Sequence, residues 1–260
     1  MGDETMSKNI RYYSLATYVF RNYYNADYLL KYRNTHFVPL GTKTGFGPIQ
    51  ASSLLPASQR KYMVNFIGSI RSNRQEMVDK IKNVNISSYI NVQANWASKD
   101  GINVVNYRDI LRESAFTLAP WGNNPESLRL YEALEAGSIP IFQKLDSKRS
   151  PMTPMGENNP IPQFDNWDDA IKFVDKSRSD MKLVEQLQER VIRFWKSYKE
   201  KIQFKIKNVI DKAFKESHGY DFGYEESFET GFVKIGEEQV DSVPCQSKPI
   251  RFWLTDLILP

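Results

Sequence analysis

The residues best placed to do chemistry lie in one block, between an apolar run that ends at Leu118 and another that begins at Ile139. The block opens with a loop around Gly122 and continues with Ser127 near the expected start of a helix. The first turn of a helix carries unpaired backbone N–H groups and the positive end of the helix dipole, and both attract a phosphate. Ser127 adds a hydroxyl donor. The block therefore predicts an anion-binding site.

Arg129 and Glu132 are three residues apart, so they share one face of the expected helix. The guanidinium of Arg129 can bind a pyrophosphate as a fork of donors. The carboxylate of Glu132 can accept hydrogen bonds from two ribose hydroxyls. An ordinary surface ion pair is the alternative, and it is the commonest use of this spacing. The residues alone leave both interpretations open.

The elements around this block alternate between strand and helix, which predicts right-handed βαβ units and a parallel sheet. Ligands of such sheets bind beyond the carboxyl ends of the strands, so the loop 122–126 should face a site. The expected strands are 12–20, 36–40, 62–67, 89–92, 102–105, 115–119 and 139–142, and the expected helices are 73–82, 109–113, 125–136, 167–174 and a long amphipathic one over 184–213.

Composition excludes several classes of protein. The chain has 260 residues, a net charge of +4 and 41% hydrophobic residues, which is typical of a soluble globular protein and not of a disordered or nucleic-acid-binding one. The single Cys245 excludes an internal disulfide, and the two histidines, His36 and His218, form no evident metal cluster. Without a membrane-length apolar run or a secretory signal, we expect a cytosolic chain unless an upstream anchor has been removed.

One motif resembles the nucleotide-sugar-binding half of exostosin-like glycosyltransferases. It reads Ser127-x-Arg129-x-x-Glu132-Ala133-Leu134-x-Ala136-Gly137-x-Ile139-Pro140, after a strand that ends in Pro120-x-Gly122. Phe66-Ile67-Gly68-Ser69-Ile70-Arg71 with Arg74, and Tyr107-x-x-x-Leu111-x-x-Ser114-x-Phe116, resemble further parts of that half. Near the start, Gly2-Asp3-Glu4, Val19–Tyr24 and Val38–Gly41 resemble the acceptor-side half. The resemblance covers residues 2–145.

The resemblance implies an α/β fold of the GT-B type, in which two Rossmann-like domains face a cleft that holds the donor. It implies transfer of a sugar with inversion from a UDP-sugar to a glycan hydroxyl, with helix dipoles and arginines rather than a metal holding the diphosphate. Carried over by position, Arg71 and Arg74 lie by the donor phosphates, with Gly122, Ser127, Arg129 and Glu132. Tyr107 lies near the uracil. Solvated arginines and a packing tyrosine are the plain alternatives for Arg71, Arg74 and Tyr107.

Inverting transfer needs a base that takes the proton of the acceptor hydroxyl. The match of the Gly2-Asp3-Glu4 turn to an acceptor-side loop makes Asp3 or Glu4 the candidate. Glu126 at the helix start is the competitor. Ordinary terminal acidity is the alternative for Asp3 and Glu4, and stabilisation of the helix dipole is the alternative for Glu126.

The expected organisation has three parts. Residues 1–57 form a reduced acceptor-side domain, residues 58–178 the donor-binding domain, and residues 179–260 a long helix and tail that pack back on the body. Because the first part is too short for a full Rossmann domain, either the C-terminal part completes it or residues are missing upstream. Exostosin-like members are commonly anchored in the Golgi, so a Golgi or membrane-associated protein is the alternative to a cytosolic one.

The leading hypothesis for function is a UDP-sugar-dependent inverting glycosyltransferase. The expected partners are a nucleotide sugar and a glycan acceptor, with no nucleic acid and no membrane span in this chain, and no cofactor is required. Xylose is the favoured sugar because the short chain leaves little room for extra sugar-recognition loops. The alternatives are a GDP-sugar fucosyltransferase of the same architecture and a non-catalytic subunit that binds a glycan or a nucleotide sugar.

Overall fold

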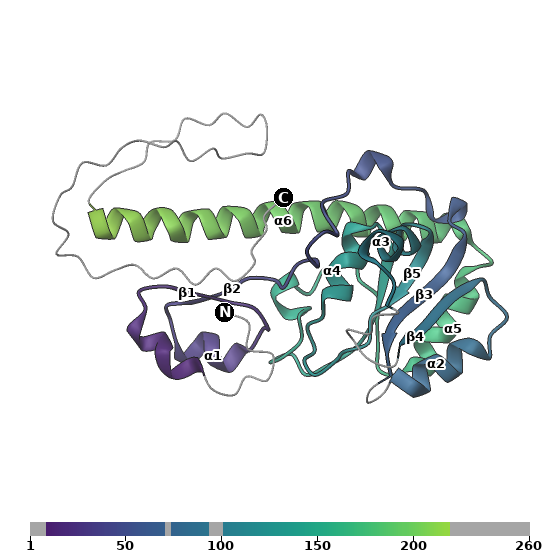
Figure 1. Ribbon diagram of the computed structural model, residues 1–260, viewed down its shortest axis with the longest axis horizontal. Helices are drawn as coiled ribbons and strands as arrows, with labels where there is room; N and C mark the ends of the chain where they lie inside the picture. Colours follow the sequence, from purple (N-terminus) through teal and green to yellow (C-terminus); the bar gives the residue numbers. More distant parts are fainter. Residues whose placement is uncertain (1–8, 71–73, 94–100, 219–260) are drawn as a thin grey trace.

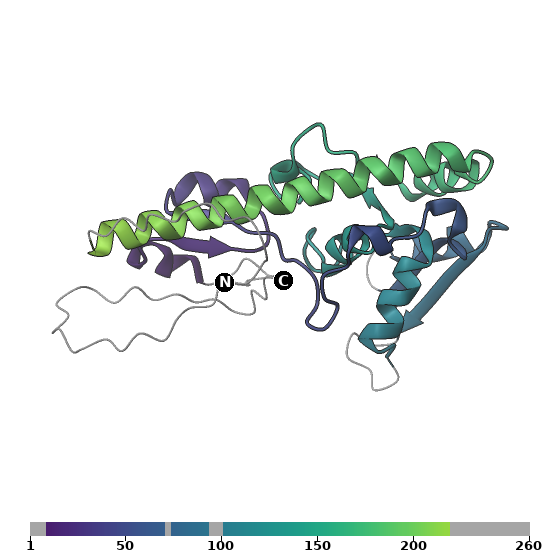
Figure 2. The same ribbon diagram turned by 90° about the horizontal axis from the view of Figure 1, so that it is seen from above.

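The structure is a computed structural model that describes residues 9–70, 74–93 and 101–218 (Figure 1). In these ranges the chain forms a small N-terminal unit and a larger unit built on a parallel sheet. The long helix α6 (Met181–His218) runs along both units, as the two perpendicular views show (Figure 1, Figure 2).

The sheet of the larger unit has the strand order β4-β3-β5-β6-β7, and every neighbouring pair is parallel. Its strands are β3 (Tyr62–Ser69), β4 (Ser88–Gln93), β5 (Ser114–Leu118), β6 (Ile139–Gln143) and β7 (Gln163–Phe164). The chain leaves β3 to one side for β4 and returns to its other side for β5. The strand order therefore reverses between β3 and β5, which is the position where such sheets bind ligands.

The helices of the larger unit are α2 (Arg74–Lys82), α3 (Val104–Arg112), α4 (Leu128–Glu135) and α5 (Trp167–Ser177). Helix α2 packs on α5, whereas α4 packs between α3 and α6. All residues of β5 are buried, and the apolar face of α2 is buried at Met77, Val78 and Ile81. This burial is the main favourable contribution that holds the layers together.

The N-terminal unit consists of η1 (Asn9–Leu15), β1 (Val19–Arg21), α1 (Ala26–Lys31) and β2 (Thr35–Phe37), with β1 and β2 paired in parallel. Arg21 is buried in it, donates a hydrogen bond to the hydroxyl of Tyr13, and lies 5.0 Å from the ring centroid of Tyr28. Contact with a tyrosine ring stabilises a buried guanidinium through a cation–π interaction.

Residues 40–49, which we call the strap, connect the two units and lie along α4. Three buried glutamates at or near α4 accept hydrogen bonds from its backbone. The N–H groups of Leu40, Lys43 and Ile49 donate to Glu126, Glu132 and Glu135 at 2.8, 3.1 and 3.0 Å, respectively. After the strap come two short 3₁₀ helices, η2 (Ala51–Ser53) and η3 (Ala57–Gln59), which lead into β3.

Three expectations about local structure are wrong. Residues 9–15 form a 3₁₀ helix, so the strand expected over 12–20 shrinks to β1, because Tyr13 turns inward to contact Arg21. The strand expected over 102–105 is the start of α3, because the side chain of Asn103 accepts a hydrogen bond from the N–H of Asn106 and caps a helix there. Helix α4 begins at Leu128 and not at Pro125, with Ser127 as its N-cap residue.

Candidate functional site

A cavity of about 640 Å³ lies where the carboxyl ends of β3 and β4 meet the start of α4. The N-terminal unit and the strap close its other side through Tyr23, Leu40 and Lys43. Its remaining lining residues are Ile67, Gly68, Ser69, Arg74, Gln93, Gly101, Ile102, Tyr107, Gly122, Asn123, Asn124, Glu126, Ser127, Leu128, Arg129 and Glu132. The structure therefore brings Arg74, Tyr107, Gly122, Ser127, Arg129 and Glu132 together in one cleft, whereas Arg71 lies outside the described residues.

The start of α4 offers hydrogen-bond donors to a ligand. Ser127 occupies the N-cap position, but its side chain makes no capping hydrogen bond. Its hydroxyl oxygen is buried and has no partner among the described residues. Because an N-cap serine normally accepts a hydrogen bond from the first turn, this hydroxyl and the first N–H groups of α4 can both bind an anion.

Arg129 lies across the end of β3. Its Nη2 atom donates to the carbonyl oxygen of Ile67 at 2.6 Å, and the guanidinium carbon lies 5.0 Å from the ring centroid of Phe66. Its Nε atom is buried without a partner among the described residues. A Cβ atom on Gly68 would lie 2.5 Å from Nη2, so glycine leaves the room that this guanidinium occupies. No ion pair joins Arg129 to Glu132 in the part of the chain that the structure describes.

Glu132 is buried on the same wall of the cleft. One carboxylate oxygen accepts from the N–H of Lys43 at 3.1 Å, and the other accepts from the hydroxyl of Tyr107 at 2.8 Å. Burial raises the pKa of Glu132, and burial together with the nearby Glu132 charge raises the pKa of the Tyr107 hydroxyl. A carboxylate has room for about four hydrogen bonds, so each oxygen of Glu132 can still accept one from a ligand.

Arg74 connects the end of β3 to the loop before α4. It donates to the carbonyl oxygens of Ser69 at 3.0 Å and Trp121 at 3.2 Å. A Cβ atom on Gly122 would lie 3.1 Å from the Nη2 atom of Arg74, so Gly122 leaves space for the guanidinium. Arg74 therefore places a positive charge at the edge of the cleft, close to the loop that precedes α4.

Of the three candidates for the base, Glu126 lies among the described residues. Asp3 and Glu4 lie outside the described residues. Glu126 is 3% exposed and lines the cleft, and its oxygens accept from the N–H of Tyr23 at 2.5 Å and the hydroxyl of Tyr131 at 2.6 Å, as well as from the strap. Burial raises the pKa of Glu126 to about 7, although the hydrogen bonds from Tyr131 and the backbone act in the opposite direction.

Gly68, Lys43 and Tyr23 are among the lining residues that were not candidates from the sequence. The resemblance placed Gly68 in the first strand and loop of the donor-binding half without giving it a role, and its close approach to Arg129 depends on the fold. Lys43 lines the cleft from the strap, and Tyr23 lines it from the loop after β1. The resemblance placed Tyr23 in the acceptor-side segment 19–24, but no pattern in the sequence singled out Tyr23 or Lys43 as a residue that lines the cleft.

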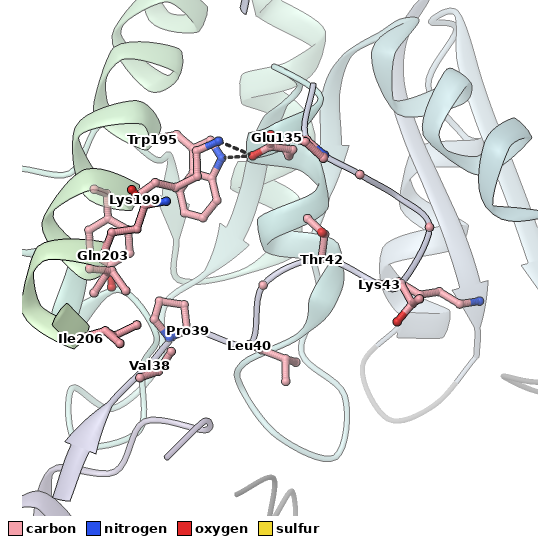
Figure 3. Close-up of a pocket in the computed structure, with 17 residues that line it drawn as sticks. Val38, Pro39, Leu40, Thr42, Lys43, Glu135, Trp195, Lys199, Gln203 and Ile206 are labelled. Carbon is pink, nitrogen blue, oxygen red and sulfur yellow. Dashed lines mark hydrogen bonds and ion pairs between the residues drawn. The ribbon is translucent and has the colours of Figure 1, made fainter. Parts of the chain in front are cut away.

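A second cavity, of about 200 Å³, lies on the other side of the strap, between the strap and α6 (Figure 3). Its charged centre is Glu135, which accepts from Trp195 Nε1 at 2.6 Å and from Lys199 Nζ at 2.8 Å. Figure 3 shows the side chain of Lys43 pointing away from this group. Leu40 and Lys43 line both cavities, so the strap separates them.

Two kinds of feature are absent from the described residues. No three histidine, cysteine, aspartate or glutamate side chains among them are grouped so that they could hold a metal ion. None of the described helices combines the length and the apolar character needed to cross a membrane.

Comparison with known families shows which family the chain belongs to. The family described as the RXYLT1 C-terminal domain matches residues 43–215, which is more than half of the chain. The chain belongs to this family. The matched range contains every described site residue except Tyr23 and Leu40, which lie before it.

Individual relatives are glycosyltransferases. The chain is 25% identical over 196 residues to ribitol-5-phosphate xylosyltransferase 1 of Homo sapiens, covering 68% of this chain and 44% of that protein. It is 29% identical over 96 residues to a probable xyloglucan galactosyltransferase of Arabidopsis thaliana, covering 34% and 20%, respectively. The chain thus spans less than half the length of these relatives. The exostosin-like, xylosyltransferase-like family expected from the sequence is confirmed.

A solved structure shows the same fold. TarM of S. aureus, determined in complex with fondaparinux, alpha-GlcNAc-glycerol and UDP, matches with a TM-score of 0.52 and 11% identity, covering 78% of this chain and 45% of that one. The likeness, together with the parallel sheet described above, confirms the expected α/β fold of the GT-B type.

Proposed function

We propose that this chain binds a UDP-sugar in the 640 Å³ cleft and transfers the sugar, with inversion, to a hydroxyl of a glycan acceptor. The single observation that carries the proposal is the arrangement along one wall. Glu132, Arg129 and the unpaired hydroxyl of Ser127 follow one another toward the start of α4. A ribose and a diphosphate follow one another in the same order in a nucleotide sugar.

Each residue has a defined task in this proposal. Glu132, held by Tyr107 and the strap, accepts hydrogen bonds from the ribose hydroxyls. The ring of Tyr107 lies next to the uracil. Ser127 and the first N–H groups of α4 bind the diphosphate, and Arg129 and Arg74 neutralise its charge as the bond to the sugar breaks. Arg71 is assigned to the same task by the sequence resemblance alone.

The reaction itself needs one proton acceptor. The acceptor oxygen forms a bond to the anomeric carbon, the bond from that carbon to the diphosphate breaks, and the hydroxyl proton passes to a carboxylate. Asp3 or Glu4 is our proposed base. UDP carries the electron pair of the broken bond away as the leaving group.

Xylose is the sugar that we propose, because the named relatives from Homo sapiens and Mus musculus are xylosyltransferases. The name of these relatives also gives ribitol 5-phosphate as what they act on. An acceptor that contains a ribitol phosphate is therefore the first to test here.

The proposal is tested first by nucleotide binding and then by turnover. UDP should raise the melting temperature of the chain and GDP should do so much less. Glu132→Gln should reduce the shift with UDP, whereas Glu189→Gln, on an exposed part of α6, should not. Equal shifts with UDP and GDP would overturn the UDP assignment. Binding of UDP-xylose without hydrolysis or transfer would instead indicate a nucleotide-sugar-binding subunit.

A further inference from the structure

Glu126 is unusual among the buried carboxylates because it gathers donors from three separate segments. One oxygen accepts from the N–H of Leu40 at 2.8 Å and from the hydroxyl of Tyr131 at 2.6 Å. The other accepts from the N–H of Tyr23 at 2.5 Å. A backbone hydrogen bond from Tyr24 acts on the same carboxylate. Four donors fill the capacity of an ionised carboxylate, so Glu126 could take a proton from a substrate only by giving up one of these hydrogen bonds.

The donors from the N-terminal unit belong to one tightly bound loop. The side chain of Asn22 donates to the carbonyl oxygens of Val38 and Pro39 at 3.0 and 3.1 Å, which joins the loop to the two residues that precede the strap. Tyr23 has φ +60°, and it is the only non-glycine residue with a positive φ in the described ranges. A tyrosine adopts this conformation only where its surroundings enforce it. The hydrogen bond from its N–H to Glu126 is a direct restraint of that kind.

The position of this loop in the cleft indicates which part of a ligand it meets. Glu132, Arg129 and Ser127 lie successively closer to the start of α4, and Glu126 comes directly before Ser127. On the proposed function, the first three face the ribose and the diphosphate. The next group in a nucleotide sugar is the sugar itself. Tyr23 and Leu40, which line the cleft and are bound to Glu126, therefore border the space where the sugar lies.

We propose that Glu126 is a positioning residue and that the loop it holds, through Tyr23, forms the wall of the sugar subsite. This inference rests on the proposed function and assigns a role that differs from that of a base. Glu126 acts by fixing the distance between the N-terminal unit and the start of α4 at Ser127. Tyr23 contacts the sugar of the donor and not its nucleotide.

Glu135 supplies a matched control. Like Glu126, it is buried near α4 and accepts one backbone N–H from the strap, in addition to side-chain donors from Trp195 and Lys199. It lines the second cavity and not the cleft. Glu135→Gln therefore repeats the loss of a buried carboxylate without touching Tyr23.

The experiment measures, by calorimetry, the Kd values of UDP and UDP-xylose. The proteins compared are the full wild-type chain and its variants Glu126→Gln, Glu135→Gln and Tyr23→Ala. In Glu126→Gln the affinity for UDP-xylose should fall about 10-fold or more, on the scale of a displaced binding group, while the Kd of UDP changes less than about 2-fold. Tyr23→Ala should show the same selective loss, and the double variant should lose little more, because both act through one loop. Glu135→Gln should leave both Kd values unchanged.

Amide hydrogen exchange reports on the restraint itself. Exchange at Tyr23 and Leu40 should accelerate in Glu126→Gln but not in Glu135→Gln, where Ile49 should respond instead. If Glu126→Gln does not fold, Tyr23→Ala and Glu126→Asp decide the question.

Two results would overturn the inference. The first is an equal loss of UDP and UDP-xylose affinity in Glu126→Gln. The second is a loss of turnover with unchanged UDP-xylose affinity and unchanged exchange at Tyr23, which would make Glu126 the base. If the wild-type chain binds neither ligand, the proposed function fails, and the exchange data still decide whether Glu126 holds the loop.

Discussion

The pKa of Glu126 makes the stability of the fold depend on pH in a direction opposite to that of most carboxylates. Burial raises this pKa from 4.5 to about 7. Between these two pH values the folded chain retains a proton that the unfolded chain has released. Raising the pH through this window therefore favours the unfolded state. The contribution of the protonated carboxyl is complete below about pH 4.5 and is lost by about pH 7.

The size of the effect follows from the same two values. Each pH unit between 4.5 and about 7 is worth about 1.4 kcal/mol for one group, so the free energy of unfolding should fall by about 3 kcal/mol. The ionisable side chains that face Glu126 are Tyr131 on α4 and Tyr198 on α6. Burial is the largest cause that raises the pKa of each of these hydroxyls, so both remain neutral throughout the window.

Glu126→Gln is the reference that isolates this contribution, because other titrating groups are common to both proteins. Urea unfolding followed by tryptophan fluorescence, at steps between pH 4 and pH 8, gives the free energy of unfolding of each. The advantage of the wild type over Glu126→Gln should shrink by about 3 kcal/mol as the pH rises across the range. A difference that stays constant would refute the reasoning. A difference that grows with pH would mean that the hydrogen bonds to the carboxylate outweigh its burial.

Other variants test the cleft and its support. Arg129→Ala should lower turnover by about 10²-fold or more with the fold intact, the scale of losing one electrostatic donor to a leaving group; near-normal kcat would leave Arg129 a packing role only. Gly68→Ala places a methyl group 2.5 Å from the Arg129 guanidinium, so UDP affinity should fall about 10-fold, and unchanged affinity in calorimetry would contradict this. Arg60 donates to four backbone carbonyls away from the cleft, and three of these hydrogen bonds are buried. Arg60→Met should therefore cost about 3 kcal/mol of stability in urea unfolding without changing the Kd of UDP, and a selective loss of UDP binding would speak against it.

The central part of the fold could be predicted from the sequence because its signals are local. The apolar runs that became β3, β5 and β6 are strands buried along most or all of their length, and the spacing of Met77, Val78 and Ile81 matches one helical face. The start of α3 was missed because a single cap, Asn103, outweighed the β-branched residues that follow it. Such a competition between a capping hydrogen bond and strand propensity is decided by the surroundings of the segment.

The candidate site, too, could be predicted only where its residues are close together in the sequence. Ser127, Arg129 and Glu132 could be proposed because they lie within six residues of one another on one helix start. Tyr23 and Lys43 could not, because they reach the cleft only through contacts between segments about 90 to 100 residues apart. Hydrogen bonds from backbone N–H groups to a distant carboxylate leave no pattern in the residue types that supply them.

The strap has a fixed length for a geometric reason. Leu40 and Ile49 are nine residues apart, as are Glu126 and Glu135, which accept their N–H groups. Most of the stretch from Glu126 to Glu135 is helix α4, which advances only about 1.5 Å per residue, whereas nine extended residues would span about 30 Å. The strap absorbs the excess in bends at Gly41, Gly45 and Gly47, each of which has a positive φ. Inserting or deleting one residue there would shift Lys43 or Ile49 away from its glutamate, so loop-length variation among relatives should be found elsewhere in the chain.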